Sequence, residues 1–144
     1  MSQLNDYTIL DSIYKNSLMA YSSTRQVLER CADGELKDYL KRQTKHYERC
    51  CRDAAQQMEE SGRRPGEIPA MQKAMSRIGI AMRTAADSSR GNIAKLMYDG
   101  TNMGIVDIAR TMNRTAGASQ KTVDMAETLL TQEEKYADGL RKFL

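Results

Sequence analysis

This chain of 144 residues contains no tryptophan, one phenylalanine, one histidine and only two prolines. With nine glycines and 40% hydrophobic residues, it lacks the composition of a disordered chain and suits a helical globular protein. No stretch approaches the roughly 18 consecutive apolar residues of a membrane-spanning helix. The start, MSQLNDY, has no basic region followed by an apolar core, as a signal peptide would. We therefore predict a cytoplasmic protein with no membrane partner.

The cysteines also exclude several roles. Cys31, Cys50 and Cys51 are odd in number, two are adjacent, and no C-x-x-C pair for zinc or redox chemistry is present. Nothing in the local sequence marks a base that would activate a thiol. We expect small core residues or free thiols.

The most apolar long segment, 92–115, organises our interpretation. Its apolar or small residues recur every three or four positions, which is the period of one buried helical face. Gly100 and Gly104 lie one turn apart and would allow a neighbouring backbone to approach closely. The predicted buried face consists of Ile93, Leu96, Met97, Gly100, Met103, Gly104, Ile108 and Met112.

Three other segments share this periodicity and predict long helices at 4–31, 35–61 and 122–143. Asn5 or Asp6 is available to cap the first, and Ser88 or Ser89 to cap the helix at 92–115. The inward positions of the first are Leu10, Ile13, Tyr14, Ser17, Tyr21, Thr24, Leu28 and Cys31. Those of the second are Leu36, Tyr39, Leu40, Gln43, His46, Tyr47, Cys50, Ala54 and Met58. Those of the third are Val123, Ala126, Leu129, Leu130, Glu133, Tyr136, Ala137, Leu140 and Phe143.

The connections set the expected order in space. Asp33-Gly34 forms a tight turn, so the first two helices run antiparallel. A loop at 61–69 and a shorter helix at 70–87 carry the chain back along the molecule, and a turn around Gly117 joins the last two helices. The shorter helix has Met71, Ala74, Met75, Ile78 and Met82 on one face. We predict an all-α domain over 1–144: an antiparallel four-helix bundle with one long crossover that contains a short extra helix.

One face of the 35–61 helix is basic. A solvated surface relieved by Asp38, Glu48 and Asp53 is favoured over a phosphate site, since no aromatic or glycine pattern for nucleic acid accompanies it. The formal net charge of +3 is also too mild to imply a nucleic-acid partner. The basic residues are Lys37, Lys41, Arg42, Lys45, Arg49 and Arg52.

Four polar residues fall on inward stripes near the middle of their helices. Gln43 and His46 are spaced i, i+3, and Glu133 and Tyr136 repeat that spacing. Groups three residues apart share a helix face, so the four could converge inside the bundle. Because buried polar groups need partners, we expect a hydrogen-bonded cluster in which Glu133 accepts from His46, Gln43 or Tyr136.

The one-crossover bundle, the paired i, i+3 polar residues and a weak echo between residues 14–19 and 98–103 resemble the ferritin-like superfamily, particularly the rubrerythrin-type bundles. The resemblance covers about residues 4 to 143. In its di-iron members, each of two helices carries Glu-x-x-His and each of the other two contributes one Glu. The resemblance therefore implies a metal centre at these four positions.

The ligands match that pattern only in part. Gln43 occupies a position where the di-iron proteins have Glu, and Tyr136 one where they have His. At the positions where each of the other two helices would contribute a Glu, the first helix has Ser17 and Tyr21, and the 92–115 helix has Gly100 and Met103. Two cations need several anionic oxygens, which these neutral groups do not supply. We expect no metal and no cofactor, as in metal-free bacterial bundles of this type. If iron or manganese does bind, the expected ligands are His46 and Glu133, with Asp99 or Asp107 as an additional ligand. Glu127 and Glu134 could contribute only if the predicted register of the 122–143 helix is wrong by one residue.

Two functional hypotheses follow. The first is a non-catalytic structural or interaction protein that forms a homo-oligomer, since no nucleophile–base pair, phosphate loop or complete metal set is apparent. The alternative is a divergent metal-binding protein or oxidoreductase that holds iron or manganese through His46 and Glu133. A third possibility is a small apolar ligand or lipid held between methionine-lined helices. The sequence does not identify a protein partner.

Overall fold

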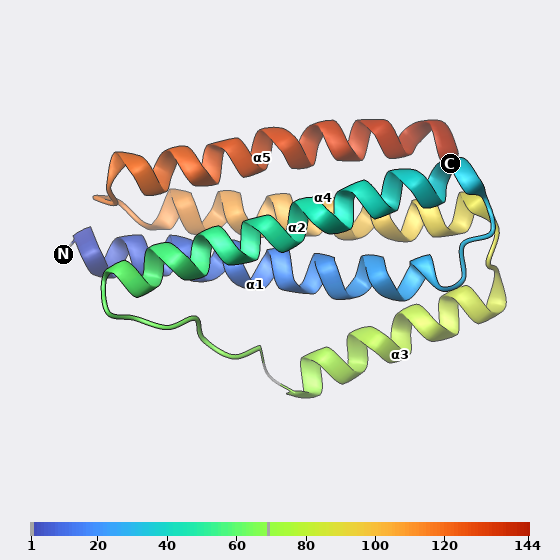
Figure 1. Cartoon of the computed structure of the whole chain (residues 1–144), viewed down its shortest axis with the longest axis horizontal. Coiled ribbons are helices and arrows are strands. Elements are labelled where there is room, and N and C mark those ends of the chain that lie inside the picture. The colour runs from blue at the N-terminus through green and yellow to red at the C-terminus, as the bar shows by residue number, and fades with distance from the viewer. Residues whose placement is uncertain (1, 69) are drawn as a thin grey trace.

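The computed structural model describes residues 2–68 and 70–144, and Figure 1 shows their arrangement. The described residues form α-helices and one terminal 3₁₀ turn, and no strand occurs among them, which confirms the all-α prediction. None of the helices in this part of the chain is both long enough and apolar enough to cross a membrane. Each predicted helix is present within a few residues. The elements are α1 (Ser2–Leu28), α2 (Gly34–Glu60), α3 (Ala70–Ala86), α4 (Arg90–Arg114), α5 (Gln120–Leu140) and η1 (Arg141–Phe143).

Side-chain caps fix the starts of three helices. In each, an Asp or Ser in extended conformation accepts a hydrogen bond from the backbone N–H three residues later, which satisfies a donor that the helix leaves free. The caps are Asp33 for α2, Ser89 for α4 and Ser119 for α5. The prediction for Ser89 is confirmed.

The prediction that Asn5 or Asp6 caps α1 is wrong, because this helix already begins at Ser2. Both side chains instead hold the turn before α5. The Asn5 amide donates to the Ala116 carbonyl at 2.7 Å, and the Asp6 carboxylate accepts from the Ser119 backbone N–H at 2.6 Å. The start of α1 is thereby tied to the turn between α4 and α5.

In Figure 1, α1 and α2 run in opposite directions, and α4 and α5 do likewise. The segment after α2 and the separate helix α3 return the chain along the length of the molecule, so α4 runs in the same direction as α2. Helix α1 packs against α2, α3, α4 and α5.

The core consists of two apolar clusters, one toward each end of the long helices. We call them the C-terminal-end cluster and the N-terminal-end cluster, after the chain terminus that each lies near (Figure 1). The C-terminal-end cluster contains Val27, Cys31, Leu36, Leu40, Tyr47, Ile93, Ala94, Met97, Tyr136, Leu140 and Phe143. The N-terminal-end cluster contains Ile9, Ile13, Ala54, Ile108, Ala126 and Leu129.

The predicted buried face of α4 is partly wrong. Ala94 and Thr101 are buried, whereas Gly100 is exposed and the Met103 side chain is 73% exposed. A Cβ placed on Gly100 would meet no atom of the described residues within 4 Å, so this glycine allows no close helix approach. The face was misassigned because Gly100 and Thr101 are adjacent, and the rotation of α4 against α1 decides which one points inward.

The predicted buried faces of α1 and α3 are also partly wrong. On α1, Ile9 and Val27 are fully buried although the predicted stripe omitted them. On α3, Met82 is 68% exposed and does not lie on a buried face. The other members of that predicted face, Met71, Ala74, Met75 and Ile78, lie outside the side chains that the structure describes, as does Pro69 of the preceding loop.

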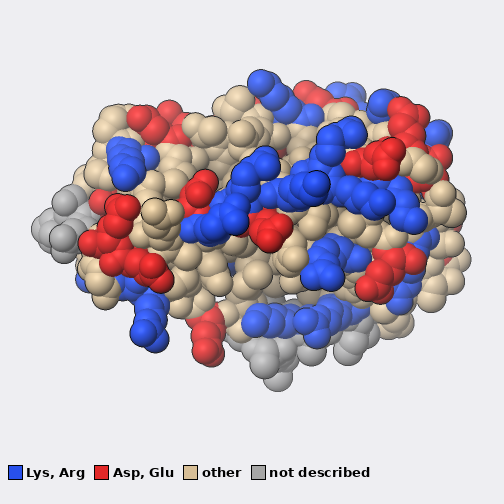
Figure 2. Space-filling model, in the orientation of Figure 1, with Lys and Arg blue, Asp and Glu red and all other residues tan. Residues whose placement is uncertain are grey.

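The outer surface of α2 is basic. Figure 2 shows Lys and Arg side chains running along α2 in the middle of this view, with acidic side chains between and beside them. Five of the six predicted basic residues are exposed: Lys41, Arg42, Lys45, Arg49 and Arg52.

Candidate functional site

A polar layer separates the two apolar clusters. Ser17 of α1, Thr101 of α4 and Glu133 of α5 are all at least 95% buried, and each lies along its helix between residues of the two clusters. Among the described residues, Glu133 is the one Asp, Glu, Lys or Arg whose side chain is buried. Because polar burial is costly without partners, these three groups define the candidate site.

The Glu133 carboxyl has two hydrogen-bond donors on α2. The Tyr47 hydroxyl donates to Oε2 at 2.8 Å, and the Gln43 amide donates to Oε1 at 3.5 Å. Burial raises the pKa of Glu133 to about 7, although both hydrogen bonds favour the ionised form and lower it. The carboxyl is thus poised between its protonated and ionised forms near neutral pH.

Of the four residues predicted to converge, the structure brings Gln43 and Glu133 together. His46 is half-buried, and its ring faces the Cys50 sulfur, with Nε2 3.6 Å from Sγ. Burial and the positive charge of Arg49 lower the pKa of His46. No hydrogen bond joins His46 or Tyr136 to Glu133 among the described residues, so Gln43 is the one of the three predicted donors that reaches this carboxyl.

Tyr47 takes the place expected for His46. The two are adjacent on α2, about 100° apart around the helix, and small rotations decide which faces the interior. Burial raises the pKa of Tyr47 well above its usual 10, and the charge of Glu133 raises it further. The phenol therefore stays protonated and remains a donor. The predicted inward face already included Tyr47, but the i, i+3 spacing from Gln43 favoured His46 as the polar residue of the cluster.

Tyr136 packs in an aromatic cluster and makes no hydrogen bond to the Glu133 carboxyl within the described residues. Its ring stacks on Tyr39 at 5.1 Å between centroids and meets Tyr47 edge-on at 6.1 Å. The Tyr39 hydroxyl donates to the Tyr136 backbone carbonyl at 2.9 Å. The Tyr136 hydroxyl itself is buried without a hydrogen-bond partner in the described part of the chain.

The thiols near the site are poor nucleophiles. Burial, followed by the charge of Glu133, raises the pKa of Cys50 to about 12. Burial also raises the pKa of Cys51 to about 11. Thiolate, the reactive form, is therefore scarce at neutral pH.

The residues present do not fit the di-metal centre that a ferritin-like fold implies. Glu133 accepts from a phenol and an amide, which are donors rather than the additional anionic ligands that two cations need. The other candidate carboxylates have separate partners, since Asp99 pairs with Lys95 at 2.7 Å and Asp107 accepts from Asn16 at 2.6 Å. Over residues 2–68 and 70–144, no three His, Cys, Asp or Glu side chains are grouped so that they could hold a metal ion.

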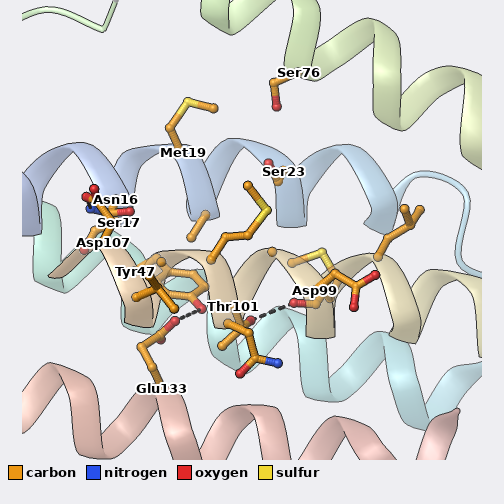
Figure 3. Close-up of a pocket in the computed structure, with 18 of the residues that line it drawn as sticks. Asn16, Ser17, Met19, Ser23, Tyr47, Ser76, Asp99, Thr101, Asp107 and Glu133 are labelled. Atoms are coloured by element: carbon orange, nitrogen blue, oxygen red, sulfur yellow. Dashed lines mark hydrogen bonds between the residues drawn. The ribbon is translucent and has the colours of Figure 1, made fainter. Parts of the chain in front are cut away.

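A cavity of about 1140 Å³ lies beside the polar layer, between α1, α3 and α4. Figure 3 shows the hydrogen-bonded Tyr47 and Glu133 at the side farthest from α3, with Met19 and Ser23 coming from α1 and Ser76 from α3. The sequence did not predict this cavity, because Gly100 and Gly104, which line it, were expected to lie in a closely packed helix interface. No known family profile, curated protein or solved structure matches the chain.

Proposed function

We propose that residues 1–144 form a ferritin-like four-helix bundle with one long crossover, and that this bundle is a non-catalytic structural or interaction protein. The topology supports the fold. Two antiparallel pairs, α1–α2 and α4–α5, are linked by a connection that contains α3 and returns the chain along the molecule (Figure 1). Bundles of the ferritin type have one such crossover.

The observation that carries the functional proposal is the state of Glu133. Its two oxygens accept from Tyr47 and Gln43, so the central carboxyl is engaged in holding α2 against α5. In a catalytic or metal-binding bundle this carboxyl would face a second acidic or basic side chain. Here it ties two helices together, which is a structural role.

Metal loading tests this proposal. We expect protein reconstituted anaerobically with iron or manganese to retain no stoichiometric metal, and the His46→Ala, Glu133→Ala double variant to behave alike in elemental analysis. A Glu134→Ala variant, altered at the exposed neighbouring position, is the control. One or two metals per chain that are lost only in the double variant would overturn the proposal in favour of a divergent iron or manganese protein.

We also propose that the protein forms a homo-oligomer through the exposed Met103 and Val106 side chains of α4. Met103 and Val106 are 73% and 47% exposed and lie one turn apart, so they form adjacent apolar contacts on one face. We expect sedimentation to show concentration-dependent association that Met103→Lys and Val106→Lys weaken. Met82→Lys, at a 68% exposed methionine on α3, is the matched control. A strict monomer at all concentrations would refute the oligomer.

A cytoplasmic location remains part of the proposal. It is supported by Cys31, Cys50 and Cys51, which are all free thiols. Reducing compartments keep thiols in this form. Fractionation of the host cell, with a thiol-reactive probe applied before and after denaturation, would test both points together.

A further inference from the structure

The outer face of α2 carries a row of like charges. Lys37, Lys41, Lys45 and Arg49 recur every four residues, and Arg52 continues this basic row three residues later. Residues three or four apart are neighbours on a helix surface, where like charges repel each other. Within the described part of the chain, none of these five side chains makes an ion pair with an acid. The protein therefore offers this repulsion no ion pair of its own as compensation.

Helix α5 carries an exposed row of the opposite sign. Asp124, Glu127, Glu134 and Asp138 follow one another at three, seven and four residues, which keeps this acidic row on one helical face. Glu127 and Glu134 make no ion pair among the described residues, and Asp138 lies 3.9 Å from Arg141. Most of the acidic row is thus also without a charged partner.

The two rows have the same spacing when one helix is read backwards. Three basic residues of α2 lie at relative positions 0, 4 and 11 along the chain, and three acidic residues of α5 lie at the same positions in reverse order. At 1.5 Å per residue, these steps correspond to about 6 and 16 Å along each helix. Antiparallel contact would set three opposite charges face to face. The pairs, all exposed, are Lys41 with Asp138, Lys45 with Glu134, and Arg52 with Glu127.

Acidic residues beside the basic row favour a protein helix over a polyanion as the partner. Asp38, Glu48 and Asp53 lie on the same helix as the basic row, and they would repel a uniformly negative polymer. In the antiparallel register, Asp38 lies three residues outside the first matched pair, and Arg141 lies opposite it. Both side chains are exposed. The α5 segment therefore matches an acid of α2 as well as its bases.

Within one molecule, α5 meets α2 through a different side. A Cβ on Gly139 would enter the space of the Tyr39 side chain of α2, so Gly139 marks the side of α5 that faces α2. Glu127 and Glu134 lie about 120–140° around the helix from Gly139. The acidic row therefore points away from α2 of its own molecule and is open to a second copy.

We propose that the basic row of α2 in one copy of this chain binds the acidic row of α5 in a second copy, with the two helices antiparallel. The contact uses two different surfaces, so each added copy leaves one row free and association can extend beyond a dimer. This inference rests on the proposed homo-oligomer and deepens it, because it assigns a second contact that does not involve Met103 or Val106 of α4. Exposed ion pairs are individually weak and are screened by salt, so the association is weak and salt-sensitive.

Sedimentation velocity of the full chain at about 20 mM and about 500 mM sodium chloride tests the contact. We expect the wild type to associate at low salt and to associate about tenfold more weakly at high salt. Lys45→Glu and Glu134→Lys should each weaken the low-salt association about tenfold, because each sets two like charges face to face.

A charge swap within one chain tests the register. The double variant Lys45→Glu, Glu134→Lys again sets opposite charges face to face, so its affinity should return to within about threefold of the wild type. Its formal net charge stays at +3, because one positive and one negative side chain exchange signs. The double variant Lys45→Glu, Glu127→Lys is the matched control. It has the same net charge but sets like charges at two pairs, so it should not recover.

Three results would overturn the inference: association of the wild type that salt does not change, equal affinity of Lys45→Glu and the two double variants, or a monomer whose basic row binds poly(U), a single-stranded RNA. Circular dichroism of each variant verifies that it is folded. Should Met103→Lys weaken association while Lys45→Glu does not, this inference fails and the α4 contact stands. The reverse result would retain the α2–α5 contact and overturn the α4 contact, so the two proposals fail separately.

Discussion

The end clusters and the polar layer between them bury their side chains in different ways. At the ends, residues such as Leu36, Leu40 and Ile93 are fully buried and need only close packing. In the middle, Glu133 depends on specific donors, while the Ser17 hydroxyl has no hydrogen-bond partner within the described residues. Packing tolerates many apolar replacements, whereas a polar layer is sensitive to single atoms. The middle of the molecule is therefore where its particular properties lie.

The largest expected effect is at an end cluster. Leu40→Ala should lower the free energy of unfolding by about 2–5 kcal/mol, through lost apolar burial and the cavity left behind. Leu40 is fully buried, whereas Leu4 is 54% exposed and provides the control. Urea denaturation of both variants would show the difference. A Leu40→Ala loss no larger than that of Leu4→Ala would mean that the end clusters are not tightly packed.

The next effect concerns the pH dependence of the polar layer. The folded pKa of Glu133, about 7, lies above the usual 4.5, so the unfolded chain loses this proton first as pH rises. Folding stability should therefore fall between about pH 4.5 and 7, by up to roughly 3 kcal/mol from this group.

The Glu133→Gln variant isolates this contribution. It should match the wild type near pH 4 and exceed it in stability near pH 8, since the amide has no proton to lose. Urea denaturation of the two proteins side by side cancels the effect of other titrating groups, including His46. Glu134→Gln, at an exposed position, is the control and should not change the slope. Parallel stability curves for wild type and Glu133→Gln would contradict the raised pKa.

Two tyrosines allow a smaller and sharper comparison within the same layer. Tyr47→Phe removes the 2.8 Å hydrogen bond to Glu133 and should cost about 1–3 kcal/mol in unfolding free energy. Tyr136→Phe removes a hydroxyl that has no partner among the described residues and should be neutral or stabilising. Thermal melts of the pair would test this order. Equal losses would mean that the Tyr47 hydroxyl does not support the carboxyl.

The smallest expected effect tests the open face of α4. Gly100→Ala should raise the unfolding free energy by up to about 1 kcal/mol, because alanine favours the helix and its Cβ meets no described atom within 4 Å. Gly139→Ala is the opposite case, since its Cβ would enter the space of the Tyr39 phenol ring. Calorimetry should show a higher melting temperature for the first and a lower one for the second. The reverse order would mean that α4 packs closely at Gly100.

Much of the local structure could be predicted. The three- and four-residue apolar period predicted every α-helix, and Ser89 predicted the start of α4, because these signals act over neighbouring residues. The inward position of Glu133 was predicted in the same way. The predicted turn at Asp33-Gly34 is wrong, because Asp33 caps α2 and Gly34 is already the first residue of that helix. The partners of Glu133 were predicted only in part, since Gln43 reaches it and His46 and Tyr136 do not.

The sequence by itself determined an all-helical chain with a carboxyl directed into its middle, because helix period and caps are local properties of the backbone. Only the tertiary structure decided that Tyr47 joins Gln43 as a donor to that carboxyl, that Gly100 is exposed, and that the Ser17 hydroxyl has no hydrogen-bond partner among the described residues. These features depend on how each helix is rotated about its axis. Adjacent residues differ by about 100° around a helix, so a modest rotation exchanges a core position for a cavity wall.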